Sequence, residues 1–302
     1  MQDILADLVE VRRVDYDAHF AHVDHQVAIT TYPHVNVRLH YVKHDAGGRC
    51  RFEELARKLV NYITLYCYAA SRRHDLHEVD RNELFQKARD LFRKSNTSGQ
   101  VGELLVYFLL ESVLGAPQAL KKMPITTNPR EERKGGDGVH LRWDNADQVL
   151  ELIFAESKLW QSFPAALTDA FDSIDKFHST RASAQEIDLF TAGFVSLSET
   201  ARDLVISYID GENVGKSRIV QACLIGFDWT EYACLDDDRR AAFLQEFEDR
   251  YRRWADDHAK ASIGEKLKAC KHRHLRFEFF LLPFRDVGAF RESFLEELGA
   301  GA

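Results

Sequence analysis

The sequence predicts an α/β protein with a restriction-endonuclease-like core (helix, three-stranded meander, helix, strand), a mixed sheet and an added N-terminal lobe. The first core helix is an apolar segment at 101–114, which stops at Gly115 with Pro117 behind it. Three segments rich in strand-forming residues follow this helix: 123–127, 138–143 and 149–158. Apolar side chains then recur at helical spacing from Phe163, and a buried strand is predicted at 219–227.

The chain before the core is expected to form a lobe of its own. Residues 1–95 are assigned to an α+β lobe that contacts a partner or DNA, and residues 96–302 to the domain that carries the chemistry. The elements predicted in the lobe are strands at 26–31 and 36–42, then helices around 52–66 and 81–94. The boundary is placed at 95–99, where cap and turn residues cluster.

The rest of the second domain continues the alternation of helices and strands. The predicted elements are helices at 185–209 and 239–258, a strand at 275–282 and a short helix at 290–298. The sequence contains no internal repeat, low-complexity tract or long linker. A repeat architecture is therefore not expected.

Composition and charge restrict the class of protein. Hydrophobic residues make up 45% and charged residues 29%, the balance of an ordinary globular protein. No apolar run approaches the ~20 residues that span a bilayer, and the N-terminus lacks a secretory pattern. Five scattered cysteines without a CxxC pair are typical of reduced thiols, so we expect a cytoplasmic protein with no membrane partner. The net charge of −8 disfavours stand-alone DNA binding.

The chemistry is expected where a glycine-rich turn enters one strand and two charged residues end the next. The turn carries Asp137, and the second strand ends in Glu156-Ser157-Lys158. Alternation places the side chains of Glu156 and Lys158 on one face. If the two strands form a hairpin, Asp137 comes level with Glu156. Two carboxylates and an ammonium at one point are what metal-dependent phosphodiester hydrolysis needs.

The predicted metal ligands for Mg²⁺ (or Mn²⁺) are Asp137, Glu156 and the backbone carbonyl of Ser157. Lys158 would orient the attacking water or neutralise charge in the transition state. Glu103, in the first turns of the 101–114 helix, joins the predicted catalytic and metal-binding set if that helix packs beside the hairpin. Each feature alone is more often a solvated strand end, an ordinary turn or a helix-terminal charge. The combination is more specific, since order, spacing and elements must all agree.

The order of these elements resembles the PD-(D/E)XK nuclease superfamily. That order is a helix with Glu, a strand, an Asp-bearing strand, a Glu-x-Lys strand and a helix. Gly136-Asp137 stands where that superfamily has Pro-Asp. A closer resemblance is to the HamA effectors of Hachiman anti-phage systems, which share this domain with AbpA-type defence proteins. The segments that carry it are Gly102-Glu103-Leu104-Leu105, the strand beginning at Met123, Gly136-Asp137-Gly138-Val139-His140 and Ala155-Glu156-Ser157-Lys158-Leu159-Trp160.

The resemblance implies a DNA nuclease effector of anti-phage defence. It also implies a partner, a superfamily 2 helicase (HamB-like) encoded alongside. The nuclease would be restrained in this complex until infection or DNA damage engages the helicase. Two other hypotheses stay open. In the first, the chain is a non-catalytic, partner-binding subunit of a helicase complex. In the second, it is a nuclease directed at RNA.

Overall fold

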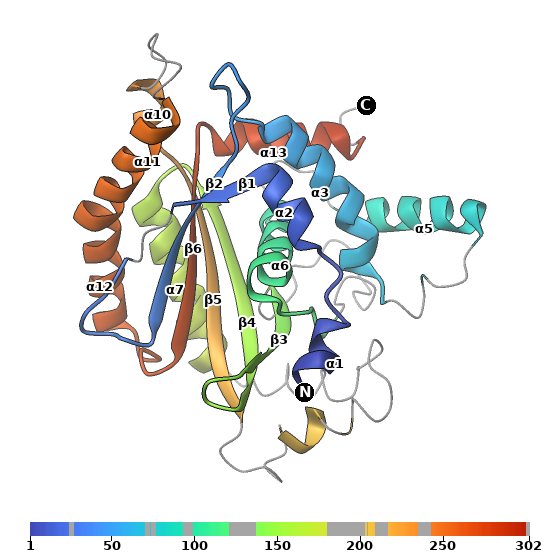
Figure 1. Cartoon of the computed structure of the whole chain (residues 1–302), viewed down its shortest axis with the longest axis horizontal. Helices are drawn as coiled ribbons and strands as arrows, with labels where there is room; N and C mark the ends of the chain where they lie inside the picture. The colour runs from blue at the N-terminus through green and yellow to red at the C-terminus, as the bar shows by residue number, and fades with distance from the viewer. Residues whose placement is uncertain are drawn as a thin grey trace.

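A six-stranded sheet runs through the computed structural model of the chain (Figure 1). The structure describes residues 1–23, 27–69, 73, 77–92, 99–120, 137–179, 203, 205–208, 217–234 and 243–299. The strands are β1 (Phe20–His22), β2 (Val35–Val42), β3 (Gly138–Asp144), β4 (Val149–Trp160), β5 (Ser217–Asp228) and β6 (Arg276–Phe284). Their order is β1-β2-β6-β5-β4-β3. The β1–β2 and β3–β4 pairs are antiparallel and the three inner pairs are parallel, so the predicted mixed sheet is confirmed.

Helices cover both faces of this sheet (Figure 1). One face carries α2 (Arg13–His19), α3 (Phe52–Cys67), α6 (Gln100–Leu114) and α13 (Val287–Glu297), with α5 (Glu78–Leu91) beside α3. The other face carries α7 (Phe163–Ser179), α11 (Phe243–Trp254), the π-helix η2 (Ala255–Ala259) and α12 (Lys260–Ala269). Two short helices are α1 (Gln2–Ala6), next to β3, and α10 (Glu231–Cys234), after β5. None of the described helices combines the length and apolar character needed to cross a bilayer.

The N-terminal strands belong to the same sheet as the rest of the chain. β2 pairs in parallel with β6, from Val35 opposite Phe277 to Leu39 opposite Leu281. The helices α3, α6 and α13 share one hydrophobic core on the adjoining face. The described part of 1–95 therefore shares its sheet and its core with the rest of the chain, and its assignment to a separate lobe stays a prediction. The predicted boundary at 96 lies outside the described residues.

Most predicted strands and helices of the second domain are present. The hairpin of β3 and β4, the helix beginning at Phe163 and the strands β5 and β6 are confirmed. The predicted strand at 26–31 is wrong for its described part: Val27 and Ile29 are buried without a ladder partner, and the chain turns between Ile29 and Tyr32. The first strand of the predicted meander, 123–127, and most of the predicted helix at 185–209 lie outside the described residues.

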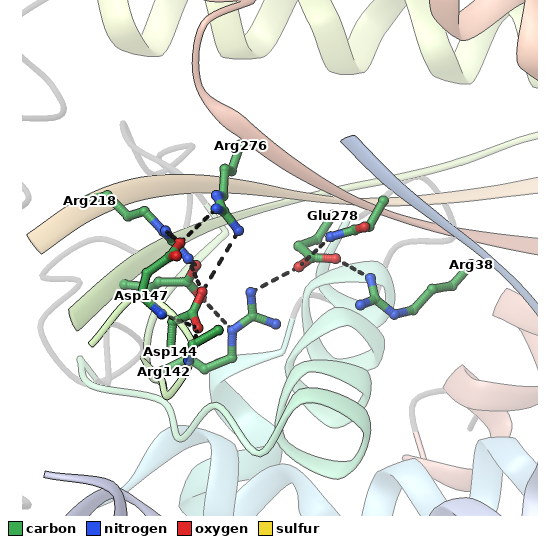
Figure 2. Close-up of polar contacts among 10 residues, drawn as sticks. Arg38, Arg142, Asp144, Asp147, Arg218, Arg276 and Glu278 are labelled. Carbon is green, nitrogen blue, oxygen red and sulfur yellow. Dashed lines mark hydrogen bonds and ion pairs between the residues drawn. The ribbon is translucent and has the colours of Figure 1, made fainter. Parts of the chain in front are cut away.

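A network of charged side chains spans the sheet at the end where β4 begins (Figure 2). Glu151 of β4 and Glu278 of β6 are buried. Arg142 of β3 bonds to both carboxylates, while Arg218 also bonds to Glu151 and Arg38 to Glu278. The outer members of the network are Asp144, Asp147 and Arg276. Buried carboxylates are tolerated when they are paired in this way.

Replacing Glu151 with glutamine should therefore lower the free energy of unfolding by about 3–5 kcal/mol, because Arg142 and Arg218 lose the carboxylate that they share. Urea denaturation measures the change. Glu53→Gln, at an exposed position of α3, is the control and should stay within about 0.5 kcal/mol of wild type. Equal midpoints for Glu151→Gln and wild type would show that the network does not stabilise this end of the sheet.

Candidate functional site at the carboxyl end of β4

The predicted site lies on the face of β4 that α7 covers. Leu152 and Phe154 of β4 belong to the same apolar cluster as Phe177 of α7. Because side chains alternate along a strand, Glu156 and Lys158 point to this face as well. Lys158 Nζ lies 3.0 Å from Glu156 Oε1. The prediction that these two side chains share a face is confirmed.

The hairpin register brings Asp137 to the same point. Gly138 pairs with Ala155, and the Asp137 backbone N–H donates to the Ala155 carbonyl at 2.9 Å. The hairpin therefore brings Asp137 close enough to Glu156 for the two carboxylates to repel each other. Its Oδ2 accepts two hydrogen bonds from Ser157, one from the backbone N–H (2.7 Å) and one from the hydroxyl (2.6 Å). The N–H and C=O of one strand residue face the same neighbour. The Ser157 carbonyl therefore also points to the side where Asp137 lies.

The charges at this point are not balanced. Burial raises the pKa of Glu156 above its ordinary value, and the Asp137 carboxylate raises it further. Attraction to Lys158 and a hydrogen bond from Ser173 offset only part of this rise. Burial lowers the pKa of Lys158, but Glu156, Asp169 and Asp137 outweigh it, so the pKa of this amine is raised and it stays charged. A buried acid with a raised pKa beside a second acid is typical of functional sites.

Helix α7 supplies two polar side chains that sequence reasoning did not select. Asp169 Oδ2 lies 3.3 Å from Lys158 Nζ, and the Ser173 hydroxyl donates to Glu156. Ser173 follows Asp169 by four positions, so both lie on one face of the helix. The signal in the sequence was their spacing, because these two polar residues fall in a helical row between the buried apolar residues Ala166 and Phe177. The row steps by three or four residues through 166, 169, 173 and 177.

On the opposite face of the sheet, α6 packs against β4 at Ser157. A Cβ atom on Gly102 would lie 2.9 Å from Ser157 Oγ and 3.3 Å from Ser157 Cβ, so the close approach depends on glycine. Glu103, the next residue of α6, accepts a hydrogen bond from the Tyr66 hydroxyl at 3.1 Å. The helix does pack beside the hairpin, as the predicted role of Glu103 requires.

The carboxylates of Glu103, Asp137 and Glu156 do not form a three-membered cluster. Across the described ranges, no group of three or more His, Cys, Asp or Glu side chains is arranged to hold a metal ion. Asp137 and Glu156, with the carbonyl of Ser157, are thus the oxygen donors that the structure brings together. A direct contact of Glu103 with the same ion stays a prediction.

The fold and this site define a mixed α/β protein that gathers two acids and a lysine at the end of a strand. The HamA family model matches residues 17–298. The chain therefore belongs to the HamA family, and this membership suggests a role related to Hachiman defence. The match includes all six strands and each predicted site residue. No curated protein matches the chain significantly.

Gly102→Ala should lower the free energy of unfolding by about 1–3 kcal/mol, because the added methyl group displaces the Ser157 side chain or the helix. Gly264→Ala in α12 is the matched control. A Cβ at Gly264 meets nothing within 4 Å, so this helical substitution should stabilise the protein by about 0.5–1 kcal/mol. Chemical denaturation compares both variants with wild type. If Gly102→Ala behaved like Gly264→Ala, the close packing of α6 on Ser157 would be refuted.

Glu156→Gln should raise the free energy of unfolding, because it removes a buried charge that faces Asp137. An acid with a raised folded-state pKa costs no stability below its ordinary value of about 4.3, and costs more as pH rises toward the raised value. The advantage of glutamine should therefore be small at about pH 5 and larger at about pH 8. Thermal unfolding at the two pH values checks this. A loss of stability that does not vary with pH would instead make Glu156 a structural counter-ion of Lys158.

Proposed function

We propose that this chain is a metal-dependent DNA nuclease that acts as the effector of an anti-phage defence system together with a superfamily 2 helicase. The observation that carries the proposal is the meeting of Asp137, Glu156 and Lys158 at the end of β4. The helix α6, the β3–β4 hairpin, α7 and the parallel strand β5 follow one another as in a restriction-endonuclease-like core. This order supports placement in the PD-(D/E)XK superfamily, and membership of the HamA family supports the defence setting.

The donor set suits a hard divalent cation such as Mg²⁺ or Mn²⁺. Asp137 and Glu156 would hold it, with the Ser157 carbonyl as a further oxygen. Two carboxylates are enough, because Mg²⁺ keeps several waters and is commonly bound through one or two acids plus substrate phosphate. Glu103 would contribute through water from α6. The raised pKa of Glu156 supports this fit, since the two acids repel each other and a cation between them removes that repulsion.

A bound cation would polarise the phosphoryl oxygen and offset the negative charge that develops on the phosphate. The protein's own groups do the rest. The two hydrogen bonds from Ser157 fix the orientation of the Asp137 carboxylate. Lys158, which Glu156 and Asp169 keep charged, would position the attacking water and stabilise the transition state. The Lys158 side chain keeps 20% of its surface exposed, which supports access of substrate to it.

The acidic chain supports the proposed need for a partner. Duplex binding depends on neutralising phosphates with Lys and Arg, and this chain has 48 acidic against 40 basic residues. Four of its arginines, Arg38, Arg142, Arg218 and Arg276, are already paired with acids in the network of Figure 2. A helicase that delivers DNA would supply the affinity for duplex DNA that this charge balance lacks.

Lys158→Ala should reduce cleavage at least about 100-fold, the usual cost of removing one group that stabilises transition-state charge. Plasmid DNA and RNA are incubated with the chain, alone and with the helicase encoded alongside, in Mg²⁺ or in EDTA. Lys176→Ala is the matched control, because Lys176 is exposed on α7. Cleavage of DNA that needs Mg²⁺, is lost in Lys158→Ala and persists in Lys176→Ala is the expected result.

Other outcomes separate the alternatives. Cleavage that survives Lys158→Ala would place the activity elsewhere. Cleavage of RNA in preference to DNA would favour an RNA-directed nuclease. An intact helicase complex that cuts nothing under any of these conditions would favour a non-catalytic, partner-binding subunit.

A further inference from the structure

The last residue of β4 is an exposed tryptophan on the face that carries the proposed site. Successive side chains of a strand point to opposite faces, and Trp160 follows Lys158 by two residues. The side chains of Glu156, Lys158 and Trp160 therefore lie on one face. Its relative exposure is 47%. The other large hydrophobic side chains exposed in the described part of the chain are Val14, Val79 and Leu244, and none of them is aromatic. An aromatic side chain left open to solvent beside a site is a common recognition element.

The indole of Trp160 has a defined orientation. Its Nε1–H donates to Asp169 Oδ2 at 3.1 Å, and the same oxygen lies 3.3 Å from Lys158 Nζ. One carboxylate of α7 therefore orients both the indole and the ammonium. A side chain that served only to fill space at the end of a strand would not need this bond.

We propose that Trp160 is a stacking platform that holds one unpaired nucleobase of the substrate next to the phosphodiester bond to be cut, so that the site takes single-stranded or locally unpaired DNA. Asp169 is a positioning residue in this arrangement, because it acts through Lys158 and Trp160. The inference rests on the proposed nuclease function and adds the substrate class to it.

Stacking requires a base whose face is open. In a duplex the bases stack on one another, so an indole reaches a base face only after the base leaves the stack. Residues two apart on a strand are about 7 Å from each other, a separation that one extended nucleotide bridges between a phosphate at Lys158 and a base on Trp160. The helicase proposed as partner would produce strands of this kind.

Binding of a fluorescent oligothymidylate of about 10 nucleotides, within the range of known single-strand sites, tests the inference without cleavage. The full chain is titrated in Ca²⁺, which takes the same oxygen ligands as Mg²⁺, and anisotropy is recorded. Trp160→Ala should weaken binding by about 5- to 150-fold, the usual cost of losing one base–aromatic stack. Trp160→Phe should keep most of the affinity, because it loses the Asp169 hydrogen bond but retains an aromatic face. Leu244→Ala, at an exposed apolar position of α11, should bind as wild type does.

Two results would overturn the inference. The first is failure of the wild-type chain to bind the oligonucleotide. The second is equal affinity of Trp160→Ala and wild type, and loss of the helicase complex in that variant would then assign Trp160 to a protein contact. The nuclease proposal fails separately. A chain that binds through Trp160 but never cuts DNA retains a single-strand site without nuclease activity. A chain that cuts through Lys158 while Trp160→Ala binds normally keeps the proposed function and loses the inference.

Discussion

The pairing of β3 with β4 is the constraint on which the candidate site depends. With Gly138 opposite Ala155, Asp137 reaches Ser157 and comes close to Glu156. A slip of one residue would turn one partner to the other face of the sheet and separate the two acids. Ser157 secures the arrangement, because its N–H and hydroxyl both bind the Asp137 carboxylate. The pairing of the β3 and β4 backbones thus sets the relative positions of the site residues.

The strand β4 carries two buried glutamates whose surroundings differ. Glu151 points to the α6 side and meets Arg142 and Arg218, so its charge is compensated. Glu156 points to the α7 side and faces another acid, which raises its pKa. The odd spacing between them places them on opposite faces. We interpret the first as a group that stabilises the sheet and the second as one kept at a cost in stability for the proposed metal site.

The sheet also places the site relative to the rest of the chain. β3 and β4 form one edge of the sheet, while β1 and β2 extend the other edge beyond β6 (Figure 1). The N-terminal strands thereby enlarge the sheet and its core without covering the end of β4. Helix α7 then joins the parts of the site, since Ser173 reaches Glu156 and Asp169 reaches both Lys158 and Trp160.

The sequence by itself determined the hairpin, the shared face of Glu156 and Lys158 and the level of Asp137, because alternation and a glycine-rich turn are local properties of the chain. Local patterns misled at 26–31, where buried apolar residues did not signify a strand. Only the tertiary structure decided that β2 pairs with β6, that α7 brings Asp169 to Lys158 and that Arg142 bridges Glu151 and Glu278. These contacts join segments far apart in the chain, and no local periodicity specifies which distant segment packs beside another.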